Sequence, residues 1–438
     1  VSDLNWNNVG VGGNFILIPS SSPVLIEGNF AYSSYQIRLQ EENLRDRTSA
    51  INGFNGGLGF TYFKGDDEIK YGIEIIGFST DFYYFNAANR EVSQQENTTE
   101  LAGYVRYKKK FGNLVIDPSF RIHYYASLST PSFEPRFGAK YNVTDNFRLK
   151  LAAGVYSQNL IAANSDRDVV NLFNGFISGP STLQDEVTNE NGEVREVKHS
   201  LQKANHFILG AEIDFTRRFS LNVEGYYKRF TQLTNINRNK VFDNPEPGLD
   251  PYLYLDYIIE TGDAYGVDFV FNYDLPSINL YAVYSLGKTV RWDGVQEYSP
   301  VFDRRHNVNL VGSYKFGKTR LWEFDVRWNM GSGFPFTQTQ GFYEQYTFQN
   351  GTSTDIINTN GELGIVYGEL NGGRLPYYHR LDMTLKREII LSTSSTLEAN
   401  IGVTNAYNRE NIFYFDRVNF ERVNQLPFMP SAGLKVNF

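Results

Sequence analysis

Apolar and polar residues alternate strictly over many short segments of this chain. In the segment "WEFDVRWNM" (322–330), the even positions from Trp322 to Trp328 are apolar and the odd positions from Glu323 to Asn329 are polar. A β-strand directs successive side chains to opposite faces of a sheet, whereas a helix repeats every 3.6 residues. This segment is therefore predicted to be a strand with one apolar face and one charged face.

The same alternation recurs along the chain and predicts roughly 17 strands. The predicted strands lie near residues 9–18, 24–38, 53–63, 69–85, 99–110, 114–126, 132–141, 147–157, 204–215, 219–230, 263–273, 277–291, 306–316, 321–332, 377–388, 396–418 and 422–438. Tight turns such as 111–113 follow odd-numbered strands, whereas long polar segments such as 158–203, 231–261 and 333–376 follow even-numbered ones. The connection at 127–132, after the sixth strand, is short and departs from this rule.

Short turns at one end and long loops at the other are typical of outer-membrane barrels. Hydrocarbon offers no hydrogen-bonding partner to a free sheet edge, so a sheet of this size in a membrane has to close on itself. We therefore expect an all-β fold, an antiparallel transmembrane β-barrel whose apolar face, with Trp322 and Trp328, contacts lipid. The alternative is a large soluble all-β protein that buries this face against a second layer.

Composition narrows the class of protein further. Aromatic residues make up 16% of the chain, yet no apolar run approaches the ~18 residues of a spanning helix, so a helical membrane protein is excluded. Lys and Arg number 41 against 49 Asp and Glu, which predicts no nucleic-acid partner. The chain has no cysteine, and its five histidines are scattered, so no metal site is expected. No catalytic constellation is found, and we expect neither an enzyme nor a cofactor.

The last strand ends in "PSAGLKVNF", with Gly433, Val436 and Phe438 at fixed spacing. This ending resembles the C-terminal signal by which the barrel-assembly machinery recognises outer-membrane proteins. The alternative is an ordinary terminal strand with an aromatic end. The resemblance predicts these three residues as an assembly signal.

Longer segments carry a second resemblance. Residues 133–158, 302–317, 376–388 and 401–415 look like parts of the barrel of TonB-dependent outer-membrane receptors, especially the Bacteroidota type. That family has a 22-stranded barrel with a plugged lumen. The resemblance implies a Gram-negative outer membrane, contact with its lipid and lipopolysaccharide, and active import of scarce ligands with energy passed through TonB.

The chain departs from the family pattern at its beginning. It opens "VSDLNWNNVG", without a plug-like domain, a TonB box or a signal peptide. It also has about five strands fewer than the family barrel, and an odd number where ordinary bacterial barrels have an even one. We therefore expect residues 1–438 to be the C-terminal barrel portion of a longer receptor, with TonB contacted through the missing N-terminal region.

Two aromatic segments in the long loops are candidate ligand-binding sites: "DNPEPGLDPYLYLDY" (243–257) and "GFYEQYTF" (341–348). Rings with a polar tip bury a large area at low entropic cost, which suits sugars, peptides or aromatic chelates. The alternative is that these rings simply pack the loops together. The predicted ligand-binding residues are Tyr252, Tyr254, Tyr257, Phe342, Tyr343 and Tyr346.

The charged face of the strands predicts the lining of the barrel. Such charges usually solvate a lumen or pair across strands, and they can also hold a plug or line a path. The predicted lumen-lining residues are Arg148, Lys150, Glu224, Lys228, Glu323, Asp325, Arg327, Arg380 and Asp382.

Active import through a gated barrel is the predicted function, with the ligand captured by the outer loops. The alternatives are a barrel subunit or scaffold of a larger outer-membrane complex, with loops that dock a surface lipoprotein, and a passive porin. The identity of the ligand is not encoded in a recognisable motif, because receptors for different solutes share this barrel.

Overall fold

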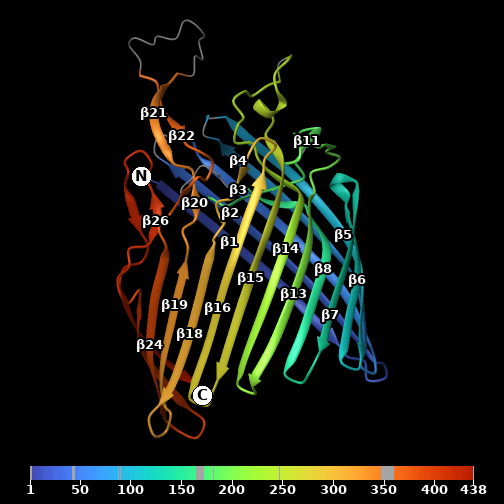
Figure 1. Cartoon of the computed structure of the whole chain (residues 1–438), viewed down its shortest axis with the longest axis vertical. Helices are drawn as coiled ribbons and strands as arrows, with labels where there is room; N and C mark the ends of the chain where they lie inside the picture. The colour runs from blue at the N-terminus through green and yellow to red at the C-terminus, as the bar shows by residue number, and fades with distance from the viewer. Residues whose placement is uncertain are drawn as a thin grey trace.

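A computed structural model describes residues 2–41, 45–86, 88, 90–163, 172–180, 182–245, 247–346 and 360–437. One antiparallel sheet of 17 long strands dominates it, and each strand pairs with its neighbour along the chain (Figure 1). These strands are β1 (Ser2–Leu17), β2 (Val24–Glu41), β3 (Arg47–Lys64), β4 (Asp67–Phe85), β5 (Glu91–Phe111), β6 (Leu114–Tyr125), β7 (Thr130–Asn142), β8 (Phe147–Gln158), β13 (Gln202–Thr216), β14 (Phe219–Ile236), β15 (Tyr257–Asp274), β16 (Ile278–Trp292), β18 (His306–Phe316), β19 (Trp322–Gly331), β24 (Tyr378–Ile390), β25 (Thr396–Thr404) and β28 (Met429–Asn437).

Short elements decorate the connections. They are the strands β9 (Leu160–Ala163), β10 (Gly175–Ser178), β11 (Glu186–Thr188), β12 (Val194–Glu196), β17 (Glu297–Tyr298), β20 (Pro335–Phe336), β21 (Thr339–Gln345), β22 (Glu362–Tyr367), β23 (Gly373–Arg374), β26 (Ile412–Phe415) and β27 (Arg422–Asn424), and the 3-10 turns η1 (Ala126–Leu128) and η2 (Pro251–Leu253). No segment of the described residues forms a helix long and apolar enough to cross a membrane.

All 17 predicted strands correspond to observed strands, and the all-β prediction is confirmed. The prediction was wrong near the end of the chain, where residues 396–418 and residues 422–438 were each expected to form one strand, although β28 begins only at Met429. β25 stops at Thr404, and the hairpin of β26 and β27 comes after it. Asn405 and Asn408 have φ values of 55° and 52°, so the chain turns through the left-handed region there. Asparagine tolerates that region better than most residues do.

The connections sort by length as the sequence predicts from β8 onward, whereas short connections join β2 to β3, β4 to β5 and β6 to β7 at the loop end. Turns of a few residues join β5 to β6, β13 to β14 and β15 to β16 at one end, whereas long loops join β8 to β13 and β14 to β15 at the other (Figure 1). The loop end is called the mouth below. The hairpin of β21 and β22 and the loop between β14 and β15 both project from it (Figure 1).

One outer and one inner face run through the whole sheet, because the cross-strand register preserves the alternation from β1 to β28. Ile73 is paired with Gly103, and both lie on the outer face, where Ile73 is 64% exposed. Far along the chain, Trp328 is paired with Leu310 on this same face. The predicted apolar stripe of β19 therefore lies on the outer face.

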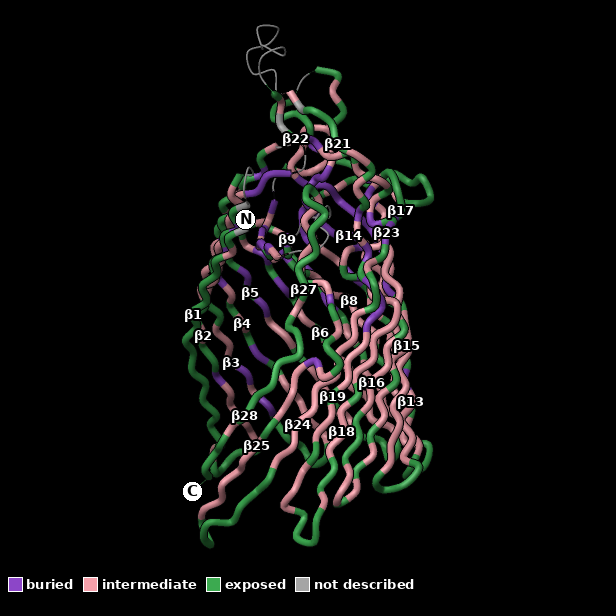
Figure 2. The backbone as a smooth tube through the Cα atoms, turned by 90° about the vertical axis from the view of Figure 1, so that its left-hand side faces the viewer, coloured by how far each residue is buried: buried purple, intermediate pink, exposed green. Residues whose placement is uncertain are grey.

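The buried core sits inside the mouth rather than between two layers. The hairpin of β9 and β10 covers the inner face of β3, β4 and β5 there (Figure 2). Phe82 of β4 and Ile177 of β10 are buried in one apolar cluster together with Ile161 and Tyr257. Lower in the wall, the inner face of β4 continues with Lys70, which is polar. The mouth is thus packed, while the wall below it presents polar groups to the interior.

The two terminal strands, β1 and β28, lie at the edges of the sheet. Within the described residues β1 pairs with β2 only, and β28 pairs with β25 only. An even number of antiparallel pairings separates β1 from β28, so these two strands run in the same direction. Direct pairing between them would be parallel, unlike every other pairing in the sheet.

Candidate functional site

All the predicted lumen-lining residues lie on the inner face of the sheet. The register connects them: Lys150 is opposite Gly210, Gly210 is opposite Glu224, and Arg327 is opposite Asp382. The nine charges therefore share one side of the sheet, and their role as the lining of a lumen stays a prediction. What the alternation did not predict is how these charges pair.

Most of these charges belong to two cross-strand clusters. In the first, Arg148 bridges Glu212 at 2.7 Å and Asp214 at 2.5 Å. Lys150 adds contacts to Glu212 at 3.2 Å and to Glu224 at 3.3 Å. These side chains span three strands, β8, β13 and β14. Because they are partly exposed, each pair contributes little to stability, and their main effect is to keep the inner wall polar.

The second cluster connects β19 to β24. Lys386 contacts Glu323 at 3.2 Å and Asp325 at 2.6 Å, and Arg380 contacts its neighbour Asp382 at 2.9 Å. Two predicted lining residues remain outside both clusters. Arg327 is exposed on the inner face, and the ammonium group of Lys228 lies 5.3 Å from the centre of the Tyr226 ring.

The first aromatic segment mainly packs the mouth. Tyr257 begins β15 and is 1% exposed, and its hydroxyl donates to the Gln94 side chain at 3.1 Å. Tyr252 lies in η2, where its hydroxyl donates to the Asp293 carbonyl at 3.3 Å. Burial raises the pKa of Tyr252 to about 12. Tyr254 is half-buried at the end of this turn. The buried ring of Tyr257 presents no free surface to a ligand in this arrangement.

The second aromatic segment is more open. Phe342 and Tyr343 lie on β21 and are 38% and 49% exposed. Phe342 meets the ring of Phe420 edge-on, with the ring centres 6.0 Å apart. Tyr346 is half-buried, and its hydrogen bond with Glu344 raises the pKa of the Tyr346 hydroxyl. The exposed candidates for ligand contact therefore project from the mouth on the β21 and β22 hairpin.

The assembly-signal residues occupy the edge strand β28. Val436 lies on the outer face opposite Leu397, and Gly433 lies on the inner face opposite Asn400. Phe438 lies outside the described residues. The role of these residues in assembly stays a prediction.

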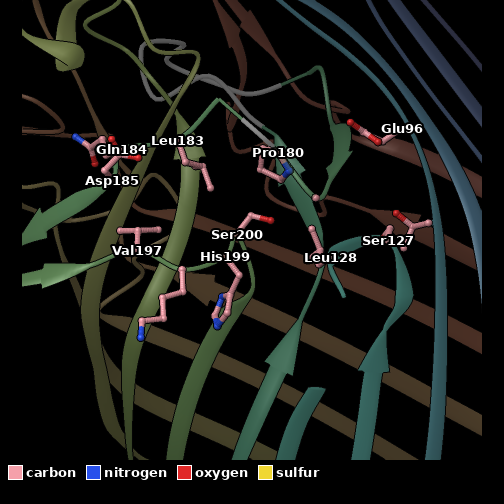
Figure 3. A pocket seen from close by; sticks show the side chains of 13 residues that line it. Glu96, Ser127, Leu128, Pro180, Leu183, Gln184, Asp185, Val197, His199 and Ser200 are labelled. Atoms are coloured by element: carbon pink, nitrogen blue, oxygen red, sulfur yellow. The ribbon is translucent and has the colours of Figure 1, made fainter. Parts of the chain in front are cut away.

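A polar cavity of about 350 Å³, here called the mouth pocket, lies beside the apolar cluster (Figure 3). Its walls come from β5, from η1, and from the segments that flank β10, β11 and β12. The lining includes Glu96, Thr98, Leu128, Asp185, His199 and Ser200. Sequence reasoning missed this site, because the wall is assembled from segments that lie far apart in the chain and share no motif.

The mouth pocket combines polar side chains with the apolar side chains of Leu128, Leu183 and Val197. No group of three His, Asp or Glu side chains suitable for a metal ion occurs in the described part of the chain. Burial lowers the pKa of His199, and the nearby Lys203 and Arg195 lower it further, so the imidazole is neutral at pH 7. The pocket can therefore offer neutral and anionic hydrogen-bonding groups.

A larger hollow, of about 650 Å³, lies on the outer face of β3 to β6. Gly56 and Gly103 leave space there, and Ile73, Leu101 and Ile122 surround it. The outward lining of this hollow is apolar, so it offers no polar groups that could bind a polar solute. The inner polar cavity is the better candidate for binding a solute.

No protein-family model matches this chain, and no curated protein matches it. Solved structures nevertheless share its architecture. The ferric citrate transporter FecA in the unliganded form matches with a TM-score of 0.60 and 13% identity over 99% of this chain. The ferric-catecholate import receptor Fiu from E. coli gives 0.60 and 12% over 99%, and the pyoverdine outer membrane receptor FpvA from Pseudomonas aeruginosa gives 0.61 and 10% over 100%. The chain has the fold of outer-membrane transporter barrels.

The match covers only part of those proteins. This chain spans 62%, 64% and 62% of the FecA, Fiu and FpvA chains, respectively. At these sequence identities the similarity concerns the fold and not the ligand. The fold is that of integral outer-membrane transporters, and the all-β structure is consistent with a place in the outer membrane.

Proposed function

We propose that this chain is the barrel part of an outer-membrane receptor that captures a scarce solute at its mouth and imports it in a TonB-dependent manner. The observation that carries the proposal is the combination of a loop-lined mouth, a polar inner wall and the fold of ferric citrate and pyoverdine receptors. A continuous polar face from β8 to β24 suits a path for a hydrated solute. Nothing in the described wall resembles a catalytic centre, so transport is favoured over catalysis.

The strand count supports a larger closed barrel. β1 and β28 run in the same direction, so an odd number of additional antiparallel strands is needed to join them with the pairing seen elsewhere. About five strands would give the 22-stranded, plugged type of barrel. We infer that these strands and a plug precede this chain in the complete receptor, and that TonB contacts that preceding region. The mass of the native protein tests this, because a native product of about 50 kDa would contradict it.

Uptake by the complete receptor tests the transport proposal. A deletion strain and its parent are compared for growth on a panel of scarce solutes, and uptake of the solute that separates them is then measured with and without a protonophore. We expect uptake to depend on both the receptor and the proton gradient. Receptor-dependent uptake that persists without the gradient would indicate a passive pore instead.

Residue substitutions connect uptake to the mouth. Tyr343→Ala and Phe342→Ala should reduce uptake if the exposed hairpin contacts the solute. Tyr346→Ala tests the end of the same strand, and Tyr254→Ala tests the η2 turn. Unchanged uptake in all four variants would remove these aromatic residues from the ligand-binding proposal.

A partner role for the mouth has one specific observation in its favour. The β21 and β22 hairpin exposes Leu363 and Val366 together with Phe342 and Tyr343, and exposed apolar groups that gather in one place mark protein contacts. A surface lipoprotein is the proposed partner. Chemical cross-linking on intact cells, with mass spectrometry of the products, should connect this hairpin to a lipoprotein. Cross-links confined to the receptor itself would contradict the partner role.

A further inference from the structure

The mouth pocket has the size and enclosure of a small-ligand site. Its volume of about 350 Å³ falls in the range of roughly 300 to 1,000 Å³ that is usual for such sites. Glu96 and Thr98 of β5 form one side, and the segment from Val197 to Ser200 faces them across the cavity (Figure 3). Leu128 and Pro180 lie between these two walls (Figure 3). The cavity thus combines apolar walls with polar groups on two sides.

Ser200 is a buried polar residue without a partner. It is 2% exposed, and within the described residues its hydroxyl makes no hydrogen bond. Its backbone is nevertheless held in place, because the Ser200 carbonyl accepts a hydrogen bond from the Thr234 hydroxyl at 3.1 Å. Figure 3 shows the hydroxyl turned toward Leu128 and Pro180. A buried hydroxyl left unbonded is destabilising, so a polar ligand atom at this position would stabilise the site.

Two more polar atoms near the pocket also lack partners. The Nδ1 atom of His199 and the Nδ2 atom of Asn159 are buried and unbonded among the described residues. Asn159 stands behind the pocket, where its Oδ1 atom accepts from the Gly179 backbone N–H at 3.0 Å. Gly179 lines the cavity. Unsatisfied groups therefore cluster around this cavity, as expected for a site whose ligand completes the hydrogen bonding.

The charge of the pocket selects the kind of ligand. The carboxylates of Glu96 and Asp185 line it, and neither forms an ion pair within the described part of the chain. Lys198 is the cation of the lining, and its ammonium group lies 3.6 Å from the exposed Glu196 carboxylate. Residues 182–203, which include the Lys203 beside His199, contain five acidic residues against one Arg and two Lys. With His199 neutral, the pocket disfavours anions and favours positive charge.

A bare metal ion does not fit this arrangement, because no three ligating side chains converge in the described residues. The apolar walls of Leu128, Leu183 and Val197 suit a short hydrocarbon segment instead. We propose that the mouth pocket binds a compact organic cation, an amine or guanidinium compound whose charged group meets Glu96 or Asp185 and whose further polar group bonds to Ser200. This proposal names a ligand class for the proposed receptor. Binding to the pocket can be tested by itself, whereas uptake of the bound cation rests on the proposed function.

Matched five-carbon probes test the proposal on the complete receptor in detergent micelles. The probes are 1,5-diaminopentane, 1,5-pentanediol and glutarate, which share a chain length and differ in charge. We expect calorimetry to show binding of the diamine at least tenfold tighter than that of the diol, and no binding of glutarate. Equal binding of the diol, tighter binding of glutarate, or no binding of the diamine would each overturn the proposal.

Substitutions locate the binding. We expect diamine binding to weaken by about threefold to tenfold in each of the variants Glu96→Gln, Asp185→Asn and Ser200→Ala. Glu193→Gln is the matched control, because Glu193 is an exposed acid of the same loop that does not line the pocket. Heat-dependent migration on detergent gels confirms that each variant is folded. Unchanged affinity for the diamine in the first three variants would overturn the assignment of the pocket. Intact binding without uptake driven by the proton gradient would instead count against the proposed transport function.

Discussion

At the residue scale, a buried ionic network holds two loops of the mouth together. Arg238 contacts Glu260 and Asp293, each at 2.8 Å, and the hydroxyl of Tyr298 lies 2.9 Å from the Arg238 guanidinium group. The side chains of Glu260 and Asp293 are fully buried. A buried charge that loses its partner is costly, because water cannot replace the lost contact. The network therefore couples the loop after β14 to the loop after β16.

Removing one carboxylate should loosen both loops. We expect Glu260→Gln to lower the free energy of local opening by about 3 kcal/mol, because Arg238 and Arg291 lose a buried partner. Hydrogen exchange of the amides in residues 237–256 measures this change. In the control variant Glu410→Gln, which removes an exposed partner of Arg422, the change should stay below about 1 kcal/mol. Equal effects of the two substitutions would contradict the coupling.

A second prediction at this scale concerns the proton affinity of His199. Burial lowers its pKa first, and the positive charges of Lys203 and Arg195 lower it further. The folded protein therefore binds this proton less tightly than the unfolded chain does, so His199 reduces stability as the pH falls below about 6.5 and not above it. NMR of histidine-labelled protein should give a midpoint below about 6.5 for His199, and Lys203→Gln should raise it. A midpoint at or above the ordinary value would be inconsistent with the buried imidazole.

At the element scale, tyrosines on the inner face lie across glycines of neighbouring strands. A Cβ atom added at Gly266 would lie 2.7 Å from the Tyr226 hydroxyl and 2.4 Å from the Leu286 carbonyl oxygen. On the same inner face, Tyr104 of β5 covers Gly72 of β4 in the same way. Such contacts fix the register between strands, because the ring needs the space that glycine leaves.

Filling that space should weaken the wall. We expect Gly266→Val to destabilise the sheet by about 1–3 kcal/mol, because the Tyr226 ring has to move. The matched control is Gly103→Val, since a Cβ atom at Gly103 meets nothing within 4 Å. Urea unfolding in detergent compares the two variants with the parent. A larger loss in the control than in Gly266→Val would refute the packing role of Tyr226.

The elements also show what the sequence could and could not predict. The long strands were predictable, because each wall residue has only two possible directions and lipid and lumen impose opposite polarity. The loops were not, since the β26 and β27 hairpin alternates in the same way without joining the wall. Residues such as Glu96 and Ser200 meet only through loop folding, and no local pattern marks them. The sequence predicts Tyr257 as a ligand-binding residue, yet β9 and β10 pack around it and bury it.

At the scale of the whole molecule, the tryptophans test which face meets lipid. Trp322 and Trp328 lie on the outer face, whereas Trp6 is paired with Ile37 on the inner face. In single-tryptophan variants of the complete receptor in vesicles, brominated acyl chains should quench Trp322 and Trp328 strongly and Trp6 weakly. The reverse order would mean that the charged face contacts lipid.

Every wall strand pairs only with its neighbours along the chain. The chain therefore consists of wall hairpins, whose length is constrained, and of segments at the mouth, whose length is less constrained. Each hairpin of the wall depends on a turn of a few residues, such as the one between β13 and β14, where one added residue shifts every side chain of a strand to the opposite face. The segments at the mouth carry no such register, so a residue added to the exposed part of the long stretch between β8 and β13 would not shift a strand of the wall. The rim at the mouth can therefore vary in length and sequence while the opposite rim stays fixed.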